Sequence, residues 1–445
     1  MPRRGASGDG SGQDVWTCRQ LARLGAWPRP ARAHGAVPEP PSRRALSGHQ
    51  PSGVGASRPF WVVVGVRIGF WAATLLALLW SPLRSGFPQF AAYGARSDFV
   101  FNVFARWDSG WFLGIAQHGY TVEQSASFFP LYPLLIRALG FVLRSDLVAA
   151  VTISLVSAGL AAVAITRIAR LSTGGSYAGD SVLFFALYPI AFVFTAAYSD
   201  GLFVALAAWA FLSALRSRPA AAGVLGAAAV LSRPTGIALL PALALLLWPK
   251  RHTARGWLRI GPLLLLPAAL VAYCLYLRSH FGDAFAFLHS EGAFWLRHVP
   301  ATGPLGGLWD AVRSGEQGAA QLVLHLPAHS GAPSGFGKPE EFAVWNVVQL
   351  ALLVATSALT WICWKRVSRA AAVYSAATII LFLSAPAAVV PLVSEPRFLI
   401  GDFPLFIALA AAAAGRPRLR SAFVVSFAAL GLLAAVGFAH GVWVS

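Results

Sequence analysis

Charged residues are scarce in this sequence, and acidic residues are the scarcest of them. Only 12% of the 445 residues are charged, with 17 Asp and Glu against 35 Lys and Arg, whereas 57% are hydrophobic. An ordinary soluble domain carries about a quarter charged residues, so this composition excludes that class. Apolar runs of about 20 residues, the length that spans a bilayer, recur from Phe60 to the C-terminal end. The sequence therefore predicts an all-α, multi-pass integral membrane protein.

Cysteines and paired acids are also too few for several kinds of site. Cys18 lies in a polar region while Cys274 and Cys363 lie in apolar segments, so no disulfide framework is expected. No Asp-x-Asp pair occurs, and the acidic cation clamp of soluble nucleotide-sugar transferases is therefore missing. Five histidines lie between residues 280 and 329, but His325 and His329 flank Pro327 and no third zinc ligand follows. No metal and no other cofactor is predicted.

The shortage of acids leaves a formal net charge of +18. The basic residues occur in short clusters between apolar segments rather than along one face, which argues against nucleic acid as a partner. Positive residues favour the cytoplasmic side of a membrane. The clusters at 216–218, 250–259, 365–369 and 416–420 are thus expected inside, together with the N-terminal tail. Two long outer loops are expected, at 81–127 and 280–341, and the Glu395/Arg397 turn also falls outside.

The chain divides into two predicted parts. Residues 1–58 are rich in Pro, Gly, Ser, Ala and Arg and are expected to form a disordered, basic cytoplasmic tail. Residues 59–445 are expected to form a polytopic membrane domain with about eleven transmembrane helices. The charge-based orientation leaves one apolar segment too many between 127 and 216. Phe128–Leu143, which is short and contains two prolines, is therefore predicted to be a partial or re-entrant helix.

The most distinctive segment for chemistry is Arg106–Tyr120, in the first outer loop. It places Asp108 at the membrane boundary, next to Trp107. An acid in such a place can take a proton from a sugar hydroxyl. Asp is also a common helix cap, here of a helix through Phe112 and Ile115. These residues alone leave both interpretations open.

Several motifs resemble one known family. The stretch Trp107–Pro133, which contains Gly119-Tyr120 and Phe128-Phe129-Pro130-Leu131-Tyr132-Pro133, closely resembles the PIG-V family. That family comprises the second mannosyltransferases of glycosylphosphatidylinositol anchor synthesis and their bacterial relatives. Downstream, Tyr198-Ser199-Asp200-Gly201-Leu202-Phe203 is similar to the family's Tyr-Ser-Glu-x-Leu-Phe element, with Asp in place of Glu. Arg233-Pro234-Thr235-Gly236 is a weaker match to an Arg-Ser-Asn-Gly-like turn.

The resemblance implies a GT-C type glycosyltransferase of the cell membrane. It would use a polyprenyl-phosphate-linked mannose on the extracytoplasmic face, with Asp108 as the catalytic residue. A lipid phosphate leaving group must be held by cations, and the candidates are Arg106, Arg233 and Arg397, which otherwise only snorkel at helix ends. Asp200 is predicted to bind a sugar hydroxyl or an arginine, with helix capping as the alternative. The remaining substrate-binding candidates carry ring side chains, whose alternative for any aromatic is a membrane-interface belt: Trp107, His118, Tyr120, Tyr132 and Tyr198.

These features predict transfer of a mannosyl residue from polyprenyl-phosphate mannose to a glycolipid, glycan or protein acceptor. A single displacement would invert the anomeric centre, with Asp108 activating the acceptor hydroxyl and an arginine holding the lipid phosphate. The alternatives are a transporter or flippase of a lipid-linked saccharide, and a GT-C transferase that uses another lipid-linked sugar. Ionisable residues crowd the outer boundary rather than the membrane midplane, which favours surface chemistry over transport.

Overall fold

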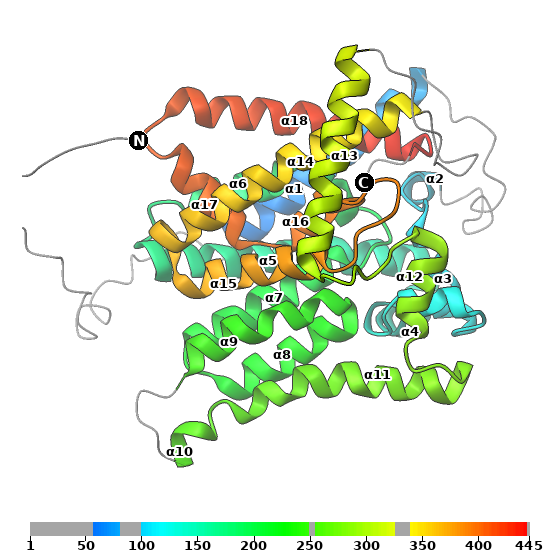
Figure 1. Ribbon diagram of the computed structural model, residues 1–445, viewed down its shortest axis with the longest axis vertical. Helices are drawn as coiled ribbons and strands as arrows, with labels where there is room; N and C mark the ends of the chain where they lie inside the picture. Colours follow the sequence, from blue (N-terminus) through cyan, green and yellow to red (C-terminus); the bar gives the residue numbers. More distant parts are fainter. Residues whose placement is uncertain (1–56, 81–98, 249–253, 325–338, 443–445) are drawn as a thin grey trace, which may run out of the picture. The chain divides into compact units, whose positions relative to one another are not determined.

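The computed structural model describes residues 57–80, 99–248, 254–324 and 339–442, all within one compact unit, Gly55–Ser445. These residues are almost entirely helical (Figure 1), and apart from one isolated bridge between Arg297 and Ala387 they form no strand. The predicted all-α class is confirmed for this part of the chain. The predicted tail, residues 1–58, lies outside the described residues except at its last two positions.

The α-helices alternate with short 3-10 or π segments, labelled η. In chain order they are α1 (Arg58–Trp80), α2 (Phe99–Asn102), α3 (Asp108–His118), η4 (Glu123–Ser127), α4 (Leu131–Leu143), α5 (Asp146–Thr173), α6 (Ala178–Leu187), η5 (Pro189–Phe194), α7 (Asp200–Leu215), α8 (Pro219–Ser232), η6 (Pro234–Ala238), α9 (Leu239–Leu247), α10 (Ala254–Trp257), η7 (Gly261–Leu264), α11 (Leu265–Phe281), α12 (Ala286–Trp295), α13 (Pro304–Leu324), α14 (Pro339–Ile362), η8 (Cys363–Val367), α15 (Arg369–Leu383), α16 (Glu395–Gly401), α17 (Pro404–Ala413) and α18 (Pro417–Ala439).

Five of the described helical stretches are long and apolar enough to cross a membrane. They are α1, α5, the continuous η7–α11 stretch, the α14–η8 stretch and α18. A sixth candidate is the pair α16 and α17, which is bent by 91° at a short break. Six further apolar helices have only 10–17 residues. The predicted number of about eleven spans is therefore not confirmed, because it requires several of these shorter helices to cross as well.

The long helix α5 packs against α7, α4 and α1. Small residues make the approach of α5 and α7 close: a Cβ added at Gly201 would lie 2.4 Å from the Ser154 carbonyl oxygen. Small residues at helix contacts are typical of membrane proteins, where close backbone packing replaces the hydrophobic effect. This contact fixes the first turn of α7, which begins with Asp200.

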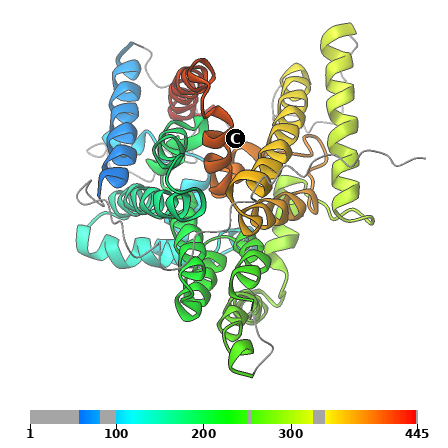
Figure 2. The same ribbon diagram turned by 90° about the vertical axis from the view of Figure 1, so that its left-hand side faces the viewer.

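The two outer loops expected from the sequence contain helices. The described part of the first loop forms α2, α3 and η4, and the second loop contains α12 and the 21-residue α13. Figures 1 and 2 show α13 beside α14. Glycines allow α13 to pack closely: a Cβ at Gly307 would lie 1.9 Å from the carbonyl oxygen of Leu383, the last residue of α15, and one at Gly318 would lie 2.6 Å from that of Ala343 in α14. The two helices within 280–341 were not predicted, and the position of this segment on the outer side stays a prediction.

The predicted partial helix corresponds to α4. It has 13 residues, so it is about 20 Å long at 1.5 Å per residue, shorter than the roughly 30 Å hydrocarbon core. It packs against α3 and α5. Its length agrees with a helix that does not cross, and a re-entrant path stays a prediction.

Candidate active site

Four charged side chains from four different helices meet in one cluster. Asp108 is the first residue of α3 and Asp200 is the first residue of α7. Arg233 directly follows α8, and Arg397 lies in the short helix α16. All four are sequence-predicted site residues. We refer to Asp108, Asp200, Arg233 and Arg397 as the ion cluster.

Arg397 is the central member of the ion cluster. Its Nε and Nη2 donate to Asp200 Oδ2 at 3.1 and 3.0 Å, and its Nη1 donates to Asp108 Oδ2. Arg233 Nη1 donates to Asp200 Oδ1. The charges thus alternate along the chain of contacts, with two carboxylates and two guanidinium groups. Buried charges are tolerated when they are paired and hydrogen-bonded in this way.

The four side chains differ in their access to solvent. Asp200 is sealed, with 2% of its side-chain surface exposed. Asp108 and Arg397 each expose 11%, and Arg233 exposes 14%. The exposed parts of Asp108 and of both arginines are therefore accessible to a substrate. Asp200 is not accessible, and its carboxylate contacts the two arginines from the protein interior. Of the alternatives for Asp200, the structure shows the one in which the carboxylate binds arginine.

The backbone is strained just before two members of the ion cluster. Trp107 precedes Asp108 with φ +53°, and Ser394 precedes α16 with φ +67°. Positive φ is rare for residues other than glycine, and strain of this kind concentrates at functional sites. Asp108 itself is not the cap of α3: Trp107 holds the N-cap position, no side-chain cap bond forms, and the Asp108 carboxylate contacts Arg397 instead. The capping interpretation is therefore wrong.

Tyr198 extends the ion cluster. The Arg397 guanidinium carbon lies 4.4 Å from the centroid of the Tyr198 ring, a cation–π contact that fixes the plane of the guanidinium. This tyrosine lies two residues before Asp200, so the predicted Tyr-Ser-Asp element supplies both a carboxylate and an aromatic ring to the same arginine.

Other predicted substrate-binding residues do not reach the ion cluster. Arg106 turns back toward its own segment, where Nη1 lies 3.5 Å from the Asn102 carbonyl oxygen, and burial lowers its pKa. His118 is exposed at the C-terminal end of α3. Tyr132 is completely buried, and its hydroxyl donates to Ala150 O at 2.9 Å. His118 lies at the opposite end of α3 from Asp108, whereas Arg106 precedes this helix and Tyr132 belongs to α4.

A second ion pair, absent from the sequence-based prediction, lies near the ion cluster. Arg297 Nε is 3.2 Å from Glu291 Oε2. The Phe398 ring links the two groups of charges, because the guanidinium carbons of Arg233 and Arg297 lie 5.4 and 5.6 Å from its centroid. The sequence signal was weak: Glu291 is the one acid of α12, and no motif surrounds it.

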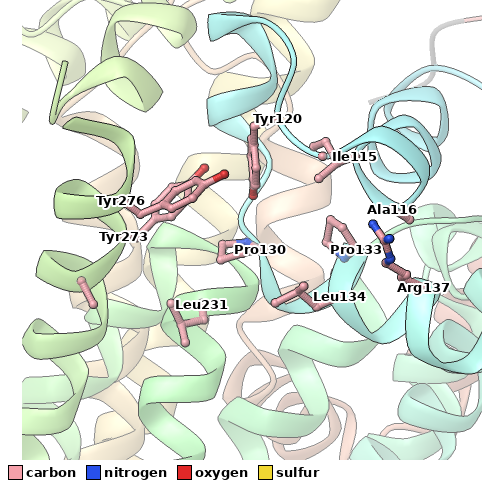
Figure 3. A pocket seen from close by; sticks show the side chains of 12 residues that line it. Ile115, Ala116, Tyr120, Pro130, Pro133, Leu134, Arg137, Leu231, Tyr273 and Tyr276 are labelled. Carbon is pink, nitrogen blue, oxygen red and sulfur yellow. The ribbon is translucent and has the colours of Figure 1, made fainter. Parts of the chain in front are cut away.

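An apolar pocket of about 390 Å³ lies between α3, α4 and α11. Figure 3 shows Tyr120, Tyr273 and Tyr276 gathered at one side and Arg137 at the other. The hydroxyl groups of two tyrosines are used internally, since Tyr120 donates to Phe128 O at 2.7 Å and Tyr273 donates to Ala126 O at 2.8 Å. The pocket thus presents mainly ring faces and aliphatic groups. Its Leu231 lies two residues before Arg233 of the ion cluster.

No group of three or more potential metal ligands comes together among the described residues. His280 and His289 are engaged separately: His280 Nε2 is 2.6 Å from Tyr120 O, and His289 Nδ1 is 2.5 Å from Asp283 Oδ2. His325 and His329 lie outside the described residues.

Comparisons with known proteins agree with the sequence motifs. Residues 70–247 match the family described as "Mannosyltransferase (PIG-V)". The mouse (Mus musculus) protein "GPI alpha-1,6-mannosyltransferase 2" is 34% identical over 164 residues, covering 34% of this chain and 33% of the mouse protein. The match therefore spans about a third of the length of that relative. The archaeal oligosaccharyltransferase AglB from Archaeoglobus fulgidus, solved with an inhibitory peptide and a dolichol-phosphate, is 13% identical with a TM-score of 0.40. That alignment covers 85% of this chain and 55% of AglB, a similarity too low to define the fold.

Proposed function

We propose that this chain, whose residues 70–247 match the PIG-V mannosyltransferase family, is a membrane mannosyltransferase of GT-C type. Its donor is polyprenyl-phosphate mannose, and its acceptor is an extracytoplasmic glycolipid, glycan or protein. The observation that carries the proposal is the position of Arg397, which donates to both Asp108 and Asp200. A candidate base and candidate phosphate-binding cations thus lie side by side.

The proposed reaction is one displacement at the anomeric carbon. Asp108 accepts the proton of the acceptor hydroxyl, and the hydroxyl oxygen forms a bond to that carbon. The bond between the anomeric carbon and the phosphate oxygen breaks at the same time, and the lipid phosphate leaves with the electron pair. A single displacement inverts the configuration, so a β-linked donor gives an α-mannoside.

The two arginines are the proposed phosphate ligands. Both expose part of their side chains, and a guanidinium can donate to two phosphate oxygens at once. Asp200 holds them in place from its sealed position, which reduces the reorganisation needed when the negative charge of the phosphate develops. The preorganised cations would supply the electrostatic stabilisation that a metal supplies in other transferases.

The apolar pocket supports a lipid-linked donor. Its aromatic and aliphatic lining suits a prenyl chain, and Leu231 connects it to the turn that holds Arg233. A chain bound there would leave its phosphate end close to the ion cluster. In this proposal the pocket and the cluster bind the two ends of the same substrate.

Reconstitution of the full chain into lipid vesicles tests the proposal. Polyprenyl-phosphate mannose with a labelled sugar should donate the label to an acceptor extracted from cell membranes, and the anomeric configuration of the product should be α. Movement of the lipid-linked sugar between leaflets without transfer would contradict the proposal and support a flippase. Transfer from a different sugar at a higher kcat/KM would support the other alternative, a GT-C transferase with another donor.

A further inference from the structure

Glu291 lies in α12 and forms the ion pair with Arg297 near the ion cluster. Its side chain retains 34% of its accessible surface, yet burial among surrounding groups raises its pKa, against the opposing effect of Arg297. The Phe398 ring, next to Arg397 in the sequence, connects this pair to the ion cluster, because its centroid lies 5.6 Å from the Arg297 guanidinium carbon and 5.4 Å from that of Arg233. Asp108 and Arg233 also influence the pKa of Glu291.

Arg297 fixes the position of this carboxylate. Its Nη1 donates to Ala385 O at 2.8 Å and its Nη2 donates to Val393 O at 2.9 Å, while Nε contacts Glu291. The neighbouring backbone is held as well, because His298 N donates to Pro386 O at 3.0 Å. Arg297 therefore ties the end of α12 to the segment that leads into α16 and Arg397.

The first loop holds the other side of α12. Ser290 Oγ donates to Glu123 O at 2.7 Å, and Ser127 Oγ donates to Phe287 O at 3.4 Å. These contacts join α12 to η4, which lies shortly after α3 and its Asp108. Glu291 is thus positioned between the segment that carries the proposed base and the segment that carries a proposed phosphate ligand.

We propose that Glu291 is a sugar-binding residue of the active site, which accepts hydrogen bonds from hydroxyl groups of the transferred mannosyl residue, and that Arg297 is its positioning residue. This inference rests on the proposed transferase function. In a displacement, the transferred sugar lies between the acceptor oxygen and the leaving phosphate. Glu291 is held between the segment that follows Asp108 and the segment that leads into Arg397, which would place it beside this sugar.

A charged carboxylate makes stronger hydrogen bonds to hydroxyl groups than a neutral amide does. A site built to bind a hydroxyl also rejects substrates that lack it, because its own polar group is then left unpaired. Glu291 would accordingly contribute both to donor affinity and to the choice of sugar.

The test compares wild type, Glu291→Gln, Glu291→Asp and the control Glu316→Gln, whose residue lies exposed on α13. The donors are polyprenyl-phosphate mannose and analogues that each lack one sugar hydroxyl. Glu291→Gln should raise the KM for the intact donor at least tenfold. For one deoxy analogue the difference between wild type and Glu291→Gln should nearly vanish, because the lost hydroxyl is the one that Glu291 binds. Glu291→Asp should recover part of the affinity, and Glu316→Gln should match wild type.

If Glu291→Gln raised the KM equally for every analogue and also lowered the unfolding temperature, the sugar-binding role would be overturned. Glu291 would then serve only to hold Arg297 in place. An unchanged KM in Glu291→Gln would overturn it as well. Failure of the proposed transferase function would be recognised by a different result, because wild type would then transfer no mannose at all from the intact donor.

Discussion

Arg397 donates three hydrogen bonds to Asp200: Nε and Nη2 donate to Oδ2 at 3.1 and 3.0 Å, and Nε also donates to Oδ1 at 3.3 Å. This contact connects α16 to α7 across 197 positions of the chain and leaves the third guanidinium nitrogen to Asp108. Asp200 also accepts a hydrogen bond from Arg233. One sealed carboxylate thus sets the positions of both arginines that are proposed to bind phosphate.

Replacement of Asp200 by Asn should therefore affect stability as well as activity. The variant leaves two buried guanidinium groups without the negative charge between them, and removal of one partner from a buried ion pair costs about 3–5 kcal/mol. Thermal and denaturant unfolding of the purified protein in detergent measure the loss. Asp180→Asn is the matched control, because Asp180 pairs with Arg420 at a more exposed position, where a pair contributes about 0–1 kcal/mol. Equal stability of the two variants would contradict the supporting role of Asp200.

Asp108→Asn should instead reduce turnover while the protein remains folded. Asn keeps the shape of the side chain and one hydrogen-bond acceptor for Arg397, but it cannot take the proton of the acceptor hydroxyl. The kcat should fall by roughly 10²–10⁴-fold, the typical contribution of a general base, and the KM for the donor should change less. Asp310→Asn, in the partly exposed pair with His298, is the control. Near wild-type transfer by Asp108→Asn would remove Asp108 from the mechanism.

The sequence indicated the members of the ion cluster, because each lies in a short motif or at the edge of an apolar segment. It did not show that they meet, since Asp108 and Arg397 are 289 positions apart and no local pattern links them. The partial helix expected at Phe128–Leu143 lies close to the observed α4, Leu131–Leu143. The bend between α16 and α17 was not predicted, although Asp402 lies in the break and Pro404 begins α17.

The glycines of α13 show why this helix was not predicted from the sequence. Gly307, Gly315 and Gly318 are buried positions where the backbone of α13 approaches neighbouring helices. Local composition does not distinguish a glycine that bends the chain from one that allows close packing. Glu291 was not predicted as a site residue, because no motif marks it and its partner Arg297 is identified only by the folded structure.

Gly307→Ala should destabilise the packing of α13. The added Cβ would lie 1.9 Å from the Leu383 carbonyl oxygen, and backbone atoms there must shift. Overpacking of this kind costs about 1–3 kcal/mol, which unfolding experiments in detergent can resolve. Gly179→Ala is the control, because nothing lies within 4 Å of its added Cβ and its position is helical. There the substitution should leave stability unchanged or raise it by up to about 1 kcal/mol. A stable Gly307→Ala variant would show that α13 has room to move.

The affinity for the donor should depend on pH through Glu291. Burial raises the pKa of this carboxyl, with Asp108 adding to the effect and Arg297, Ser127 and Arg233 opposing it. As the pH falls through the raised pKa, Glu291 becomes protonated and loses its charge-assisted hydrogen bonds to the sugar. The KM for polyprenyl-phosphate mannose should therefore rise on the acid side in wild type. In Glu291→Gln it should already be high and should vary less over the same range. Parallel pH profiles of KM in the two proteins would contradict this assignment.

The apolar pocket should determine the preference for long prenyl chains. Each methylene group buried from water contributes about 0.8 kcal/mol, so wild type should bind long-chain polyprenyl-phosphate mannose more tightly than a short-chain analogue. Leu134→Trp fills part of the pocket, which Leu134 lines from α4 (Figure 3). It should raise the KM for the long-chain donor about tenfold and leave transfer from the short-chain donor nearly unchanged. Val142→Trp, at an exposed position of the same helix outside the pocket lining, controls for an added indole ring at the membrane surface. If both variants kept the wild-type preference for chain length, the prenyl chain would bind elsewhere. An unchanged rate with the short-chain donor would show that the substitution does not affect the reaction at the ion cluster.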